Sequence, residues 1–242
     1  MRLLQSKLLQ PYPKLVHAFT DKSCGNLAFH VNDDLKNVIT NHRKLAEVLT
    51  YDLDTLVHMK QIHSDIVHIV YSQDKFNNPP TCDALITDKL NTPLMVMVAD
   101  CSPILFFDPI KRVVAVAHAG REGTFTNIVQ NVINIFSNNY RSNTKDIIVS
   151  IGPSILECCY EVGDEIYEIA KKLNYSYAMQ QKNNKYHLNI STILLNQLLD
   201  AGIKRENIEI SKECTKCLNH KYYSYRADRN CGRFAGIIYL QS

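Results

Sequence analysis

The sequence contains no tryptophan, so its aromatic contacts must come from tyrosine, phenylalanine or histidine. Its net charge is only +3, without a run of lysines and arginines. This excludes nucleic acid as the main partner, because phosphate binding needs clustered basic residues. No apolar run approaches the length of a membrane span, and residues 1–10 do not resemble a secretory signal. We therefore expect neither a nucleic-acid nor a membrane partner.

The eight cysteines lack the regular spacing of a disulfide framework. Without a secretory signal, this pattern indicates reduced thiols and a cytoplasmic location. The 45% hydrophobic and 21% charged residues are ordinary for a globular protein. No linker, low-complexity tract or internal repeat occurs. A chain of 242 residues can bury its core without disulfides, and we expect one compact domain.

Hydrophobic spacing predicts a mixture of strands and helices. Asp33-Asp34 can cap a helix over Leu35–Leu49, whose apolar stripe is Leu35, Val38, Ile39, Leu45, Ala46 and Leu49. Strands are expected between Asp65 and His118, with turns near Asn78-Pro80 and Asp108-Arg112. The remaining predicted elements are a helix over Thr124–Asn138, a strand over Asp146–Ile151, helices over Gly163–Leu173 and Ser191–Ala201, and strands over Ile208–Ile210 and Ala235–Leu240. This pattern predicts an α+β fold with mixed sheets.

Two apolar runs end in chemically capable residues. The run Val96-Met97-Val98-Ala99 leads into Asp100-Cys101, and the run Val114 to Ala117 ends in His118. We interpret Cys101 and His118 as site residues delivered by neighbouring strand ends, with His63 as a third candidate. The helix expected from Thr124 would point free N–H groups at the turn after His118, which favours an anion there.

One thiolate and two imidazoles allow two interpretations. They match the ligands that zinc prefers, and three protein ligands leave a fourth position open for water or substrate. Copper is a rival metal, because two histidines, one cysteine and a nearby methionine resemble a blue-copper set. Alternatively, Cys101 and His118 form a nucleophilic pair. Asp100 supports a functional site, since a charge at the end of a buried strand is costly without a task or a partner.

Other motifs carry weaker signals. Cys214-Thr-Lys-Cys217 is a lone CxxC motif with three interpretations. It could be redox-active, or it could bind a second metal together with Cys158-Cys159. The third interpretation, that these are incidental thiols, is favoured. The stretch Tyr222–Arg229 sets aromatic rings beside two arginines, which suits stacking and anion binding. Asn26 is a plausible polar loop contact.

Several blocks together resemble the YfiH/laccase-domain family. They occur in the family's order and span about Asn26 to the C-terminus. The blocks are Gln61-Ile62-His63, Cys82 to Thr87, Ala99 to Pro103, His118-Ala119-Gly120, Ile151 to Ile155, Tyr160 to Gly163, Tyr223 to Asp228 and Gly232-Arg233.

The resemblance implies a four-layer α/β/β/α sandwich with mixed sheets, formed by one domain over residues 1–242. It implies zinc held by His63, Cys101 and His118, with Asn26, Tyr160 and Arg226 at the substrate. It also implies purine nucleoside phosphorolysis of adenosine, inosine or methylthioadenosine, with nucleoside and phosphate as small-molecule partners. Adenosine deamination is also attributed to the family, and there Asp83 or Asp100 would handle protons.

The family offers alternatives to a phosphorylase. Its older label is a copper polyphenol oxidase, some bacterial members are linked to peptidoglycan-precursor editing, and the fold is grouped with Cys/His amide hydrolases. A binding protein without turnover is a fourth hypothesis, because two segments depart from the family pattern. Arg121-Glu122 stands where the family has Trp-Arg, and Asp21-Lys22 stands in a segment that normally carries Thr-Arg and a glycine-rich turn. Lys22 or Arg121 could replace the lost positive charge.

Overall fold

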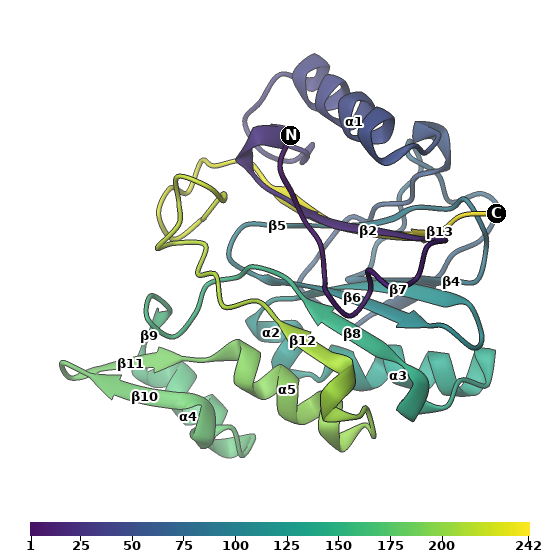
Figure 1. Ribbon diagram of the computed structural model, residues 1–242. Coiled ribbons are helices and arrows are strands. Elements are labelled where there is room, and N and C mark those ends of the chain that lie inside the picture. The colour runs from purple at the N-terminus through teal and green to yellow at the C-terminus, as the bar shows by residue number, and fades with distance from the viewer.

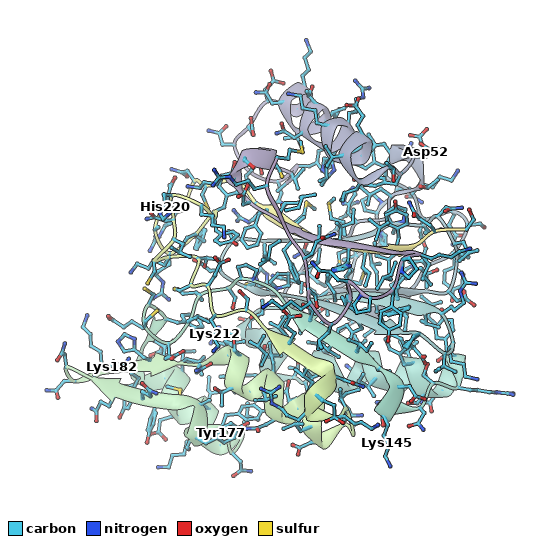
Figure 2. All side chains as sticks on the ribbon, in the orientation of Figure 1. Asp52, Lys145, Tyr177, Lys182, Lys212 and His220 are labelled. Atoms are coloured by element: carbon cyan, nitrogen blue, oxygen red, sulfur yellow. The ribbon has the colours of Figure 1, made fainter.

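The computed structural model describes residues 1–242 and shows four stacked layers (Figure 1). Helix α1 (Leu35–Leu49) covers a four-stranded sheet, and a six-stranded sheet lies beneath it. The far face of this second sheet is covered by helices α2 (Arg121–Phe125), α3 (Ile128–Tyr140) and α5 (Ile190–Asp200). This α/β/β/α arrangement is the one that the family resemblance implied, and of its two large sheets only the lower one is mixed. Figure 2 shows side chains filling the space between the layers. None of the helices combines the length and apolar character needed to cross a membrane.

The upper sheet is antiparallel throughout and has the order β1-β2-β13-β5. Its strands are β1 (Leu3–Leu4), β2 (Leu15–Thr20), β13 (Phe234–Leu240) and β5 (Leu94–Val98). Helix α1 (Leu35–Leu49) lies over it and has the predicted bounds, with the Asp34 side chain capping the N–H of Lys36. The predicted stripe is wrong at Leu35, which is 58% exposed, whereas His42 is fully buried. Leu35 is the first residue of the helix and the only one of the six predicted stripe residues that is exposed.

The lower sheet has the order β12-β8-β6-β7-β4-β3. Its outer pairs, β12 with β8 and β3 with β4, are parallel, and its inner pairs are antiparallel. The strands are β3 (Val67–Ile69), β4 (Ala84–Thr87), β6 (Ser102–Asp108), β7 (Val113–Ala119), β8 (Ile148–Ile151) and β12 (Ile208–Ile210). The predicted turn near Asp108-Arg112 joins β6 to β7.

The helix expected over Thr124–Asn138 is two helices. Helix α2 (Arg121–Phe125) begins directly after Gly120, and α3 (Ile128–Tyr140) begins after Asn127. Asn127 has φ 61°, a left-handed conformation that breaks the helix, while its side chain caps the N–H of Gln130. The helix after the His118 turn therefore begins three residues earlier than predicted, at Arg121, and the N–H of Thr124 donates within it to the carbonyl of Gly120 at 2.9 Å.

The segment between β8 and β12 adds a small lobe beside the lower layers (Figure 1). The lobe contains α4 (Asp164–Lys172) and an antiparallel sheet of β10 (Met179–Lys182), β11 (Lys185–Leu188) and β9 (Glu161–Val162), and α5 (Ile190–Asp200) then packs into the core beneath the lower sheet. Both helices were predicted within one residue, but the small sheet was not. Its strands are short and mostly exposed, so they lack the apolar signal by which a buried strand is found.

Three apolar cores separate the four layers. Strands β6 and β7 alternate between two of them: Ile104 and Phe106 face α3 and α5, whereas Leu105 and Phe107 face the upper sheet. The third core lies between the upper sheet and α1. In β7, His118 follows Val114 and Val116 on the face toward the upper sheet, because side chains two residues apart point the same way.

The expectation that Cys101 and His118 follow the ends of two neighbouring strands is wrong. The run ending at Val98 is β5, which belongs to the upper sheet, whereas His118 lies in β7 of the lower sheet. Cys101 sits where the chain crosses between the sheets. It comes close to His118 because β6 starts at Ser102 and pairs antiparallel with β7, which sets Pro103 opposite His118.

Candidate metal centre and active site

A cavity of about 940 Å³ opens where the two sheets part. Of the site residues inferred from the sequence, six line it: His63, Asp100, Cys101, His118, Tyr160 and Arg226. Asp83 and Asn26 do not line the cavity. Side chains that were not singled out as site residues also line it, and these include His30, Gln61, Tyr225, Arg229 and Arg233.

His63, Cys101 and His118 converge at the base of this cavity. Their donor atoms all lie within 4.8 Å of one another, and the two imidazole rings meet edge to face at 4.8 Å between centroids. Gly120 permits this packing, because a Cβ there would lie 3.1 Å from both the Cys101 sulfur and Cδ2 of His63. The three residues come from the loop before β3, the crossover between β5 and β6, and strand β7, so only the fold brings them together.

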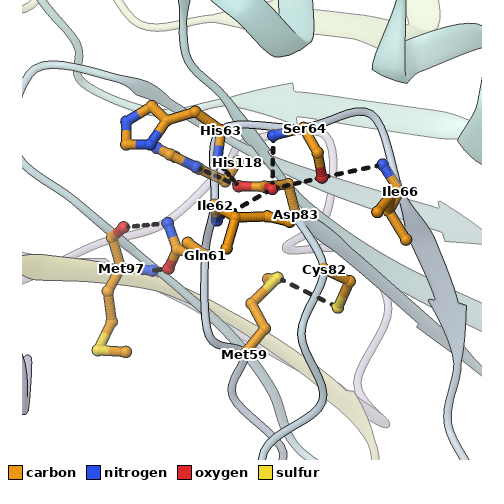
Figure 3. Close-up of polar contacts among 10 residues, drawn as sticks. All are labelled: Met59, Gln61, Ile62, His63, Ser64, Ile66, Cys82, Asp83, Met97 and His118. Atoms are coloured by element: carbon orange, nitrogen blue, oxygen red, sulfur yellow. Dashed lines mark hydrogen bonds and ion pairs between the residues drawn. The ribbon is translucent and has the colours of Figure 1, made fainter.

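Asp83 lies outside the cavity lining and forms hydrogen bonds to His118 and to the loop of His63 (Figure 3). Its carboxylate accepts hydrogen bonds from the N–H groups of Ile62 (3.2 Å), His63 (3.1 Å) and Ser64 (2.7 Å), and from the Ser64 hydroxyl (2.7 Å). It also contacts Nδ1 of His118 at 2.8 Å. Since Nδ1 is engaged, Nε2 of His118 is the nitrogen left for a ligand. An outer carboxylate of this kind orients metal-binding histidines.

The charges in the cluster depend on one another. Burial alone would raise the pKa of the Asp83 carboxyl, but hydrogen bonds from His118 and Ser64 lower the pKa to about 2. Burial alone would lower the pKa of His118, but the Cys101 thiolate and Asp83 raise it to about 9. The same imidazoles lower the pKa of Cys101 to about 6 against the effect of burial. The cluster therefore stabilises a thiolate near neutral pH.

Gln61 joins the His63 loop to the upper sheet. Its side-chain amide donates to the carbonyl of Met97 at 2.8 Å and accepts from the N–H of Met97 at 3.0 Å (Figure 3). This pair of bonds substitutes for a strand partner at the edge of β5. His63 itself has φ 60°, a left-handed conformation held by the bonds to Asp83.

Asp100 lines the cavity, but its carboxylate is engaged. One oxygen accepts from the Thr215 hydroxyl at 2.6 Å and the other from the backbone N–H of Arg226 at 2.6 Å. Its own backbone is left-handed, with φ 86°. Asp100 thus ties the crossover between the sheets to the C-terminal loop that carries Arg226.

Four arginines line the cavity, against one carboxylate, that of Asp100. Arg121 forms an ion pair with Glu122 at 3.0 Å, whereas Arg226, Arg229 and Arg233 form none. Arg226 donates to the carbonyl of Glu161 at 2.8 Å and lies 5.2 Å from the centroid of the Tyr160 ring. Three guanidinium groups without a carboxylate partner give the cavity a positive field suited to an anion.

Asn26 and Lys22 act outside the cavity lining. The Asn26 side chain accepts from the N–H of Arg233 at 2.9 Å and so fixes the start of the segment before β13. The ammonium of Lys22 lies 5.3 Å from the centroid of the Tyr223 ring. Of the two candidates for replacing the family's missing charge, Arg121 therefore reaches the cavity and Lys22 does not.

The two cavity arginines that were not among the predicted site residues both lie in sequence motifs noted above. Arg229 belongs to the stretch of tyrosines and arginines noted above, and Arg233 belongs to the Gly232-Arg233 block. His30 has no such signal, since it follows an exposed Phe29 in a loop.

The donor set fits a metal ion that accepts nitrogen and sulfur ligands. One thiolate and two imidazoles converge on a single point, with one imidazole oriented by a buried carboxylate. The cavity beside them leaves room for a substrate. The only other convergent group of possible ligands consists of four cysteines, Cys158, Cys159, Cys214 and Cys217.

Comparisons with known proteins agree with the fold and with the blocks of sequence. The family model described as multi-copper polyphenol oxidoreductase laccase matches residues 19–241. The purine nucleoside phosphorylase YlmD of Bacillus subtilis (strain 168) is 30% identical over 93% of this chain and 88% of its own. The adenosine deaminase RL5, from an unknown prokaryotic organism, is 33% identical over 88% of this chain and 86% of its own. The crystal structure of the Bacillus licheniformis hypothetical protein YfiH superposes with a TM-score of 0.90 at 32% identity, covering 95% of this chain and 94% of that one.

Proposed function

This chain belongs to the multi-copper polyphenol oxidoreductase laccase family, and from that membership we propose that it is a zinc-dependent purine nucleoside phosphorylase. The observation that supports this most strongly is one cavity that contains both the His63, Cys101 and His118 donors and three arginines without a carboxylate partner. The proposed substrates are inosine or adenosine, with methylthioadenosine as a further candidate, and inorganic phosphate.

Phosphorolysis replaces the glycosidic bond of the nucleoside by a bond to phosphate. A phosphate oxygen forms a bond to C1′ of the ribose while the bond from C1′ to the purine nitrogen breaks. The electron pair of that bond leaves with the base, which takes up a proton. The products are ribose 1-phosphate and the free purine, so the site has to bind an anion, hold the sugar and accommodate charge developing on the base.

We assign phosphate binding to Arg226 and its neighbours. Arg226 is held by the carbonyl of Glu161 and by its own N–H bond to Asp100, so its guanidinium is positioned before substrate arrives. Arg229 and Arg233 extend the same positive surface. A guanidinium can contact two phosphate oxygens at once, which a lysine cannot.

We assign the aromatic rings to the nucleoside. Tyr160 and Tyr225 line the cavity, and each lies beside an arginine, at 5.2 Å for Arg226 over Tyr160 and 5.9 Å for Arg233 over Tyr225. A purine ring can stack on a tyrosine while the neighbouring guanidinium contacts the phosphate. This arrangement would bring the base and the anion to opposite sides of the ribose.

His63, Cys101 and His118 would hold zinc in this proposal. When bound, zinc would act as a Lewis acid beside the reacting sugar and base. Asp83 would be a positioning residue rather than a proton carrier, since it is fully buried and accepts hydrogen bonds from the His63 loop and from His118. Asp100 would position Arg226, because both of its oxygens accept hydrogen bonds.

The test is a phosphorolysis assay on zinc-loaded protein. Inosine or adenosine with phosphate should yield free base and ribose 1-phosphate, and leaving out phosphate should abolish both products. Arg226→Gln should raise KM for phosphate at least tenfold, since it removes a charge-assisted contact worth more than about 1.4 kcal/mol. Arg43→Gln, an exposed arginine on α1, is the matched control and should leave KM unchanged. Zinc-loaded protein that releases no base from either nucleoside would reject the proposal.

The same residues support a second candidate, an amide hydrolase with Cys101 as the nucleophile. Asp83, His118 and Cys101 are arranged as orienting acid, base and nucleophile, and the pKa of Cys101 is lowered to about 6. Such an enzyme would act on an amide, for instance in a peptidoglycan precursor. It would keep its activity in a chelator and lose it on alkylation of Cys101, whereas the phosphorylase would lose activity in the chelator.

Two further activities are separated by their products. Adenosine deamination would give inosine from adenosine without phosphate, an activity named for the relative RL5. A copper polyphenol oxidase would consume dioxygen. Multi-electron oxygen chemistry needs several copper centres. Apart from the group of His63, Cys101 and His118, the only other cluster of possible metal ligands in this chain consists of four cysteines. We therefore favour zinc over copper at the His63, Cys101 and His118 site.

A further inference from the structure

Four cysteines outside the candidate active site also converge. The Sγ atoms of Cys158, Cys159, Cys214 and Cys217 all lie within 4.8 Å of one another. Cys217 Sγ lies 3.6 Å from Cys158 Sγ and 3.4 Å from Cys159 Sγ. The two pairs come from segments far apart in the chain, since Cys158 and Cys217 are separated by 59 positions.

The arrangement differs from that of disulfides. A disulfide joins two sulfurs at about 2.0 Å and leaves other sulfurs out of reach. Here Cys217 is nearly equidistant from two sulfurs, and a fourth lies within the same small volume. Four sulfurs around one zinc ion at about 2.3 Å would be separated by about 3.8 Å in a tetrahedron. The observed spacing is close to that geometry.

The backbone holds the two segments in register. Ser154 and Cys214 form a parallel bridge, and the N–H of Thr215 donates to the carbonyl of Ser154 at 3.0 Å. Residues 157–159 then form a turn that brings the adjacent Cys158 and Cys159 to the same side as the CxxC segment. The loop carrying Cys214 and Cys217 runs between Lys212 and His220, which are labelled in Figure 2.

We propose that Cys158, Cys159, Cys214 and Cys217 form a structural zinc site. Four thiolates are a complete tetrahedral ligand set, so this site has no open position and does not take part in the reaction. Three of the four sulfurs belong to residues that are exposed or partly exposed, and an ion can therefore enter from the surface. The site is separate from the His63, Cys101 and His118 cluster and does not depend on the function proposed above.

The zinc would clamp two loops that form a wall of the cavity. Ile155 and Tyr160, which flank the cysteine pair, line the cavity. Thr215, beside Cys214, donates its hydroxyl to Asp100. Removing the ion would loosen this wall without removing any residue that faces the substrate.

Zinc content tests the proposal directly. Protein purified under reducing conditions and loaded with zinc should hold two zinc ions per chain, measured by elemental analysis against protein concentration. Cys217→Ser and Cys158→Ser should each lower this to one, as should Cys101→Ala, and a Cys101→Ala/Cys217→Ser variant should hold none. Cys24→Ser, a buried cysteine outside both clusters, is the control and should keep two. A zinc content that Cys217→Ser leaves unchanged would overturn the proposal, whereas one zinc in the parent protein and none in Cys217→Ser would support this site and reject zinc at the His63, Cys101 and His118 cluster.

A second measurement does not depend on stoichiometry. Cobalt added to Cys101→Ala should give the sulfur-to-cobalt charge-transfer absorption of a thiolate site, and the same addition to Cys101→Ala/Cys217→Ser should not. Circular dichroism checks that each variant is folded. Absence of the absorption from folded Cys101→Ala, or a disulfide between these cysteines in the intact mass of zinc-loaded, reduced protein, would contradict the site.

Discussion

At the scale of single residues, one carboxylate determines the geometry of the candidate active site. Asp83 contacts His118 and holds the loop of His63 through three N–H groups. It therefore orients both imidazoles at once from a position without solvent exposure. His68 and Asp74 form another close His–Asp pair, at 2.7 Å, away from the cavity, and this pair provides an internal comparison.

We expect Asp83→Asn to weaken the proposed zinc binding at the His63, Cys101 and His118 site by about 10- to 100-fold, because an amide cannot accept all of these hydrogen bonds. Competition with a chromogenic chelator, in a Cys217→Ser background that limits the measurement to one site, gives the affinity. Asp74→Asn breaks the comparison pair and should leave the affinity unchanged. Equal affinities for the two variants would show that Asp83 does not position the ligands.

Gly120 leaves room for two of the proposed metal ligands, because it has no side chain to press on them. Its backbone is extended, with φ −73°, so alanine adds no conformational strain. The added Cβ would press on the Cys101 sulfur and the His63 ring. We expect Gly120→Ala to weaken zinc binding by about tenfold, measured in the same assay. Gly163→Ala, whose Cβ would meet only the flexible Glu165 side chain, is the control and should bind zinc normally.

At the scale of elements, the break between α2 and α3 turns the chain immediately after the site. Asn127 combines two properties at the break: a left-handed backbone with φ 61° and a side chain that caps α3. Asparagine tolerates this conformation better than most residues. The break lets α2 start directly after Gly120 while α3 lies along the lower sheet.

The two properties of Asn127 can be separated by substitution. Asn127→Ala should lower the free energy of unfolding by about 1–2 kcal/mol, because it loses the cap and retains the unfavourable φ. Asn127→Gly should cost only a few tenths of a kcal/mol, since glycine adopts this φ freely. Urea unfolding followed by circular dichroism measures both. An equal loss for the two variants would mean that the backbone conformation contributes nothing.

At the scale of the whole molecule, the packed cores that stabilise the fold and the cavity that holds the candidate site lie in different places. Three apolar cores fill the interfaces between layers, and the cavity opens at the edge where the two sheets part. Some ionisable groups nevertheless lie in the packed interior. His42 of α1 is fully buried against the rings of Phe29, His58 and Phe76, and one of its ring nitrogens bonds to the carbonyl of Leu27 while Nδ1 has no partner.

His42 makes the stability of the molecule depend on pH. Burial lowers its pKa from 6.5 to about 4, so the folded protein stays neutral at His42 where the unfolded chain takes up a proton. The unfolded state then binds more protons, and the free energy of unfolding falls as the pH is lowered from about 6.5 to about 4. The loss attributable to His42 is about 3 kcal/mol. At neutral pH this penalty is absent.

The measurement is urea unfolding at several pH values with chelator present, so that metal release does not contribute. His42→Gln, which keeps a donor for the Leu27 carbonyl, should be less sensitive to pH between 6.5 and 4 than the parent. His220→Gln, an exposed histidine, serves as the control and should retain the parent's pH dependence. Parallel curves for the parent and His42→Gln would contradict the assignment.

Much of the fold followed from local patterns. Helix α1 has the predicted bounds because a cap and an apolar stripe mark it, and β13 was predicted within one residue because it is continuously apolar. The sheet of β9, β10 and β11 was missed, since its residues are largely polar and exposed. The break at Asn127 was missed because the apolar spacing continues across it.

The sequence by itself determined the residue types at the site and their order in the chain, because apolar runs mark strands and the blocks around His63, Cys101 and His118 resemble one family. Only the tertiary structure decided which side chains meet. Cys101 reaches His118 through the pairing of β6 with β7, not through the strand that precedes it. Arg233 enters the cavity, Asn26 stays behind it, and four cysteines from two loops share one point. These are contacts between distant segments, and sheet register and loop packing fix them rather than local sequence.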